Sequence, residues 1–165
     1  MLAGMVTVIT MVALSPQTQD TAPPTSAPTI EQIRYQEGLK TATRGVAQIR
    51  DGLNRVARTQ RADSLTRRRA ARRLGGLCGT ARTFIVSGRP KMQATAFADS
   101  IRILAKQLTT RLDSLTSVLP TCEKTAGRDP TVATTLTTRL KNYDDAVLAF
   151  RNALKPDSTK TASQQ

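Results

Sequence analysis

Apolar residues recur with a helical period along most of the chain, from about Thr29 onward. In the first stretch the gaps between them alternate between four and three residues, which is a heptad seam. The seam residues are Tyr35, Leu39, Ala42, Val46, Ile49, Leu53 and Val56. Thr29 and Gln32 have the spacing of a capping box immediately before the seam, so a helix is predicted to begin after Thr29.

Three further segments show the same amphipathic period. They run from about Ser64 to Val86, from about Lys91 to Leu119, and from about Pro130 to Leu154. The turn sequence Ser87–Pro90 is predicted to end the second segment, and Pro120 the third. Asp129 is predicted as the N-cap of the fourth segment, with Pro130 at its first helical position.

Four amphipathic segments with mostly short connections predict an all-α protein, an antiparallel four-helix bundle over residues 30–155. No stretch alternates between apolar and polar residues for long enough to indicate a strand. Two alternatives stay open. The first two segments could fuse through residues 59–63 into a long helical hairpin, or the heptads could pair two chains in a coiled-coil dimer.

Glycines accompany the first two helical segments. Gly38, Gly45 and Gly52 fall one heptad apart beside the seam. They are either a ridge that lets a neighbouring helix pack closely or three tolerated glycines, and the spacing favours neither. Three more glycines weaken the second segment, each by about 1 kcal/mol relative to alanine. These are Gly75, Gly76 and Gly79.

The two ends of the chain differ in character from the helical part. Residues 1–14 carry no charge and would span about 21 Å as a helix, short of the roughly 30 Å hydrocarbon core. Residues 1–15 are therefore predicted to be a signal peptide or a short membrane anchor. Residues 16–29, rich in Pro, Thr and Ser, are predicted to be a disordered linker, and residues 156–165 a polar disordered tail. This order predicts an exported, periplasmic protein, either free or tethered to the membrane by its N-terminus.

The chain has two cysteines, Cys78 and Cys122, and two cysteines in an exported protein usually form one disulfide. A simple hairpin at Gly88 would leave them about 30 Å apart, whereas a disulfide needs Cα atoms within about 7 Å. Either the chain turns back nearer Asp99, with Pro90 only kinking the helix, or the cysteines do not pair. The redox argument favours pairing, within one chain or between chains.

Positive charge is concentrated in one part of the sequence. The net charge is +13, and the stretch from Arg55 to Arg73 contributes +7 of it, with Asp63 as its single acid. Its arginines are Arg55, Arg58, Arg61, Arg67, Arg68, Arg69, Arg72 and Arg73. They flank the turn between the first two segments, so we expect them at one end and flank of the bundle. Like charges at helical neighbour spacings destabilise a helix unless something anionic meets them. The alternative is a merely solvated face.

This basic composition predicts an anionic binding partner rather than an enzymatic reaction. An acidic protein surface would be met bidentately by guanidinium groups, and anionic lipid head groups would attract each basic residue by about 1 kcal/mol. An exported location and 3% aromatic residues count against nucleic acid. The sequence predicts a non-catalytic structural or binding protein of the bacterial cell envelope, as an accessory subunit of a larger complex or as a homodimer. The alternative is a cytosolic, basic, nucleic-acid-binding helical protein.

The composition also argues against catalysis. Histidine is absent, which excludes a Ser-His-Asp triad, a Cys-His dyad and a His-ligated zinc site. Two cysteines cannot hold a four-thiolate cluster. Asp144 and Asp145 are adjacent on a predicted helix and point about 100° apart, which is unsuited to sharing a proton or a metal ion. No catalytic, metal-ligating or cofactor-binding residue is therefore predicted, and we do not expect an enzyme.

Overall fold

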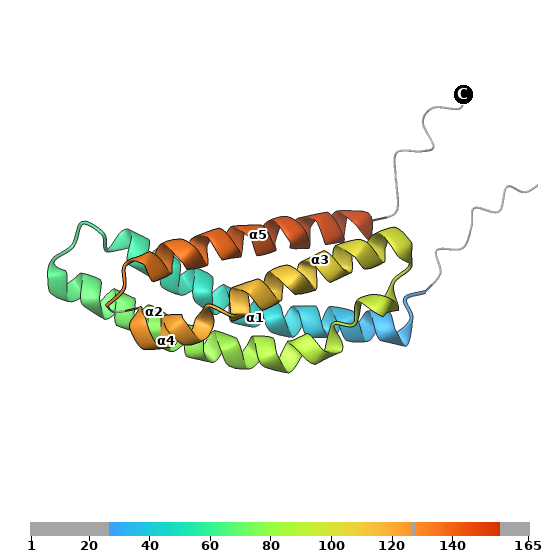
Figure 1. The fold of residues 1–165 in the computed structure, drawn as a ribbon, viewed down its shortest axis with the longest axis horizontal. Coiled ribbons are helices and arrows are strands. Elements are labelled where there is room, and N and C mark those ends of the chain that lie inside the picture. Colours follow the sequence, from blue (N-terminus) through green and yellow to red (C-terminus); the bar gives the residue numbers. More distant parts are fainter. Residues whose placement is uncertain (1–26, 127, 156–165) are drawn as a thin grey trace, which may run out of the picture.

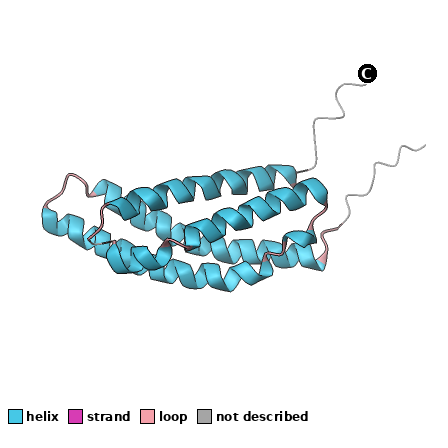
Figure 2. Ribbon diagram, in the orientation of Figure 1, coloured by secondary structure: helices cyan, strands magenta, loops and turns pink. Residues whose placement is uncertain are grey.

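The computed structural model describes residues 27–126 and 128–155. Every regular element in this part of the chain is a helix, and four long helices pack against one another (Figures 1 and 2). They are α1 (Ile30–Arg58), α2 (Ser64–Gly88), α3 (Asp99–Thr116) and α5 (Thr131–Ala153). A short helix, α4 (Leu119–Thr125), and two 3₁₀ turns, η1 (Arg89–Lys91) and η2 (Ala94–Ala96), lie between them. The predicted all-helical class is confirmed. The predicted leader, most of the linker and the tail lie outside the described residues.

Helix α1 begins where the capping box predicts. The Gln32 backbone N–H donates to Thr29 Oγ1 at 3.3 Å, and the Thr29 backbone N–H donates to Gln32 Oε1 at 3.1 Å. The first five seam residues are buried, and the last two pack half-buried against the core. Helix α1 ends at Arg58 and α2 begins at Ser64, so the first two segments do not fuse into one helix. The seam is buried against other helices of the same chain.

The heptad glycines of α1 face α2 at very close range. A Cβ atom on Gly45 would lie 2.6 Å from the Ala81 carbonyl oxygen, and one on Gly38 would lie 2.7 Å from the Gly88 carbonyl oxygen. A Cβ on Gly52 would lie 2.7 Å from Leu74 Cδ1. At Gly38 and Gly45 the neighbouring atom is backbone, so any side chain there would force the two helices apart, whereas at Gly52 it is the end of the Leu74 side chain, which can move aside. The three glycines are therefore a close-packing ridge, which settles the choice that the spacing left open.

The connection between α2 and α3 differs from the predicted one. Helix α2 ends at Gly88, the 3₁₀ turns carry the chain onward past that end, and α3 runs back only from Asp99 (Figure 1). The predicted start of the third helix at Lys91 is therefore wrong, whereas the turn near Asp99 is confirmed. Pro90 lies in the first turn of η1, where its missing N–H costs nothing, so α2 ends there and is not kinked.

Two further boundaries differ from the predicted ones. Helix α3 ends at Thr116, and Pro120 lies in the first turn of α4, so it helps to begin a helix rather than to end one. Pro130 occupies the N-cap position of α5. Asp129 still caps that helix, because its Oδ1 accepts from the Thr131 backbone N–H at 2.9 Å, and this hydrogen bonding lowers the pKa of Asp129.

The cysteines pair within the chain. Their sulfur atoms lie 2.06 Å apart and their Cα atoms 6.1 Å apart, and both residues are fully buried. The pair joins α4 to the middle of α2. The pairing is possible because ten residues separate the end of α2 from the start of α3, so the 18 residues of α3 bring the chain back only as far as Cys78.

An aromatic cluster closes the core at the other end. The rings of Tyr35, Phe97 and Phe150 contact one another, with centroids 5.0 to 5.3 Å apart. Tyr35 is fully buried, and its hydroxyl donates to the Ala105 carbonyl oxygen at 3.1 Å. Burial raises the pKa of Tyr35 above its ordinary value, with a smaller contribution from the nearby Tyr143.

This burial predicts alkaline sensitivity. Because the folded state holds the Tyr35 proton more tightly than the unfolded state, its contribution to stability is complete below about pH 10 and is lost as the pH rises further. Tyr35→Phe lacks the hydroxyl's hydrogen bond, so its free energy of unfolding at pH 8 should be about 1 kcal/mol lower than that of the wild type. Between pH 10 and 12 the free energy of unfolding of the variant should fall less steeply than that of the wild type. Urea unfolding at several pH values measures this. An equal dependence of the unfolding free energy on pH in the two proteins would contradict the prediction.

Candidate anionic-partner docking site

The eight predicted arginines gather at the end of the molecule where α1 and α2 meet, at the left in Figure 1. Arg55 and Arg58 lie in the last turn of α1, Arg61 lies in the connection, and the other five lie in the first three turns of α2. Asp63 is the N-cap of α2, and its carboxylate accepts from the Thr66 backbone N–H at 2.9 Å and from Thr66 Oγ1 at 2.7 Å. These bonds lower the pKa of Asp63, whose carboxylate caps the N-terminus of α2.

Most of these arginines are exposed and have no acidic partner. Arg55 is half-buried and lies 3.7 Å from Asp51. The other seven are exposed, and none has a carboxylate within 4.0 Å among residues 27–126 and 128–155. Within the described part of the chain, an anionic surface could therefore approach these seven arginines without first breaking an ion pair.

The packing divides the α2 arginines between two sides. Arg68 and Arg72 lie one turn apart and face α4, while Arg69 and Arg73 lie one turn apart beside Arg55 of α1. The division follows from helix geometry, since residues four apart share a face and adjacent residues are rotated by about 100°. These four arginines therefore form two strips about 100° apart on α2, one beside α4 and one beside α1.

The strip beside α4 forms a basic hollow of about 430 Å³. Four cations and one carboxylate line it together with Gly75. These charged residues are Arg68, Arg72, Glu123, Lys124 and Arg128. Glu123 is the only acid in the lining, and its nearest cation is Arg82, at 4.0 Å. We call the seven exposed arginines together with Lys124 and Arg128 the basic end.

Sequence reasoning missed Lys124 and Arg128, which lie some 50 residues beyond the arginine stretch. The contact between α2 and α4 brings them there. A Cβ on Gly75 would lie 3.2 Å from the Glu123 carbonyl oxygen, and one on Gly79 would lie 3.1 Å from Glu123 Oε1. These glycines thus give α4 room beside the disulfide. The sequence did contain one indication of this contact, because a pairing of Cys78 with Cys122 places the residues after Cys122 against α2.

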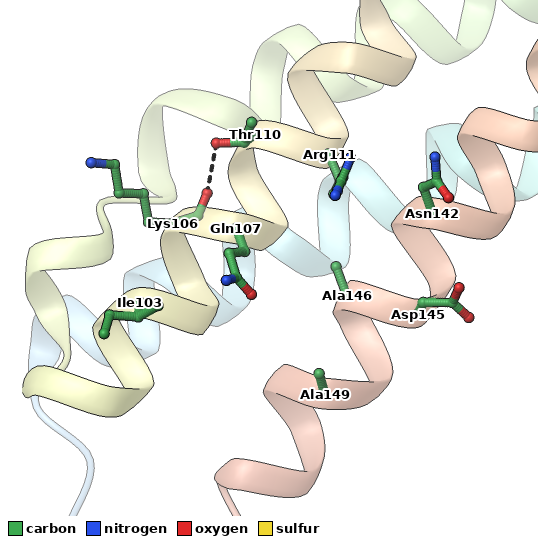
Figure 3. Close-up of a pocket in the computed structure, with 9 residues that line it drawn as sticks. All are labelled: Ile103, Lys106, Gln107, Thr110, Arg111, Asn142, Asp145, Ala146 and Ala149. Atoms are coloured by element: carbon green, nitrogen blue, oxygen red, sulfur yellow. Dashed lines mark hydrogen bonds between the residues drawn. The ribbon is translucent and has the colours of Figure 1, made fainter.

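Another surface hollow, of about 780 Å³, lies elsewhere, between α3 and α5. Gln107 and Arg111 of α3 reach toward Ala146 of α5, whereas Asp145 points away from α3 (Figure 3). Asp145 lies 2.9 Å from Lys141, and Asp144 accepts two hydrogen bonds from Arg50 at 2.8 and 3.0 Å. The two adjacent aspartates therefore serve different ion pairs. Within the part of the chain that the structure describes, no three potential metal ligands come together.

Comparison with known proteins adds no family. Among the helices of the described residues, none combines the length and apolarity needed to cross a bilayer. No protein-family profile, curated protein or solved structure matches this chain.

Proposed function

We propose that this chain is a non-catalytic structural or binding protein of the bacterial cell envelope, and that its basic end docks on an anionic surface. The observation that carries the proposal is the set of exposed cations that have no acidic partner among the described residues, which α4 extends into a four-cation hollow. Guanidinium groups grouped in this way suit carboxylates and phosphates, which they can bind bidentately. The apolar leader and the Pro/Thr-rich linker favour export and a position near the membrane.

We also infer that the four long helices form one antiparallel bundle that presents this end to its partner. Short connections join α1 to α2 and α4 to α5, and both pairings are typical of antiparallel neighbours. The glycine ridge and the disulfide hold α1, α2 and α4 together. A rigid scaffold of this kind suits an accessory subunit of a larger membrane-associated complex.

Replacing five arginines of α2 by glutamine tests the docking. The variant carries Arg67→Gln, Arg68→Gln, Arg69→Gln, Arg72→Gln and Arg73→Gln. Association with native membranes should fall at least tenfold, because each basic residue near an anionic surface contributes about 1 kcal/mol. Stability should stay equal or rise slightly, since glutamine keeps helix propensity and the repulsion is removed. Co-sedimentation at low and high salt and thermal unfolding measure the two effects.

The structure supplies a matched control and a sharper variant. Lys40, Arg44, Arg151 and Lys155 lie in the half of the molecule away from the basic end, and replacing these four by glutamine should leave docking intact. Replacing only Lys124 and Arg128 by glutamine should weaken docking severalfold, although both lie outside the arginine stretch. Unchanged association of the five-glutamine variant would mean that the arginines are only a solvated face.

Three further arms identify the partner. Binding to phosphatidylglycerol vesicles but not to phosphatidylcholine vesicles would assign anionic lipid. Loss of binding after protease treatment of the membranes would assign an acidic protein, which mass spectrometry of co-purifying chains would name. Recovery in the cytosol with nuclease-sensitive association would replace the proposal by the nucleic-acid-binding alternative.

A further inference from the structure

A second hollow, between α1 and α5, lies in the half of the molecule away from the arginines. It has a volume of about 710 Å³, within the roughly 300–1,000 Å³ typical of small-molecule sites. Leu39 and Phe150 lie beneath it and are only 7% and 1% exposed, and half-buried Leu154 and exposed Ala47 add accessible apolar surface to this floor. Toward the middle of the molecule Arg50 binds Asp144 at 2.8 Å and ties the two helices together.

The rim of this groove is cationic. Lys40 and Arg44 lie one turn apart on α1, and Arg151 and Lys155 lie at and just beyond the end of α5. All four are exposed, and none has a carboxylate within 4.0 Å in the described ranges. Among the described residues, no aspartate or glutamate lines the groove, and the other polar residues of its lining are Gln36 and Thr43.

An apolar floor under an uncompensated cationic rim is complementary to one class of ligand. We propose that this groove binds a monomeric anionic amphiphile with a single alkyl chain, such as a fatty acid. The alkyl chain lies along Leu39, Phe150 and Leu154, and the carboxylate is held by the four cations of the rim. The lining of α1 from Gln36 to Ala47 rises by about 17 Å, which suits a medium-length chain.

Calorimetric titration of the full chain with laurate, below its micelle concentration, tests the proposal. Laurate should bind with one-to-one stoichiometry. Octanoate should bind more weakly, by up to about fourfold for each methylene removed, because each buried methylene adds to the apolar contact. Dodecyl maltoside, which has the same chain and no charge, should bind at least tenfold more weakly than laurate.

Variants locate the ligand. Replacing Lys40, Arg44, Arg151 and Lys155 by glutamine should weaken laurate binding at least tenfold, whereas the five-glutamine variant of the basic end should change it less than twofold. Ala47→Trp places bulk in the groove from an exposed position outside the core, and should weaken both laurate and dodecyl maltoside. Circular dichroism and thermal unfolding confirm that each variant is folded.

Several outcomes would overturn the proposal. The absence of saturable laurate binding would do so, as would equal affinities for octanoate and laurate, which would place the alkyl chain outside the groove. An equal loss in both charge variants would indicate non-specific attraction to a basic protein. Binding only to phosphatidylglycerol vesicles, lost in the groove variant, would replace the monomeric ligand by a membrane surface. None of these outcomes tests the proposed docking of the basic end, because that docking is measured on membranes and with other variants.

Discussion

Replacing both cysteines by alanine is expected to lower the free energy of unfolding by about 4 kcal/mol. The disulfide spans 44 residues, and on the chain-entropy model a link over such a loop removes about that much freedom from the unfolded chain. For a domain of this size the melting temperature should fall by roughly 10 °C or more. Urea and thermal unfolding of Cys78→Ala/Cys122→Ala against the wild type measure the effect.

The same variant should also weaken the basic end. Helix α4 has seven residues, too few for an isolated helix to be stable, so its place beside α2 depends on packing and on the disulfide. Without the bond, amide exchange should rise most in α4, and docking should fall as it does in the Lys124/Arg128 variant. Reductant should reproduce the stability loss in the wild type and leave the variant unchanged. Full alkylation of both cysteines without reductant would contradict the prediction.

Gly45→Ala is expected to destabilise the protein by about 2 kcal/mol. The new Cβ would lie 2.6 Å from the Ala81 carbonyl oxygen, which is backbone and cannot rotate away, so α1 and α2 must separate. Overpacking of this kind costs about 1–3 kcal/mol, and a clash with backbone lies at the upper end, while alanine returns about 1 kcal/mol in helix propensity. Urea unfolding of the variant and the wild type measures the net loss.

Gly76→Ala is the matched control, because it is the same substitution in the middle of a helix. A Cβ on Gly76 would meet nothing within 4 Å, so only the gain in helix propensity remains. This variant should be more stable than the wild type by about 1 kcal/mol. Opposite signs for the two substitutions are the expected result. A stabilised Gly45→Ala would show that α1 and α2 do not pack as closely as the ridge requires.

Local patterns in the sequence determined much of the fold. The 3.6-residue period predicts the helical class, and the spacing of Thr29 and Gln32 predicts the start of α1, because both depend only on neighbouring residues. The requirement that two distant cysteines approach each other also indicates that the chain turns near Asp99. The predicted helix from Lys91 to Leu119 was wrong at both ends, because Phe97, just after η2, and Leu119, the first residue of α4, continue the period of α3 without belonging to it.

Only the tertiary structure decided what each surface contains. The sequence shows eight arginines in one stretch, but the neighbours of α2 divide four of them into two pairs, one beside α1 and one beside α4, and add Lys124 and Arg128 to the second pair. It likewise cannot separate Gly45, which meets another backbone, from Gly76, which faces open space. The cationic groove joins residues of α1 to residues more than 100 positions later in α5. Such contacts depend on how helices far apart in the chain are placed against one another, and no local pattern carries that information.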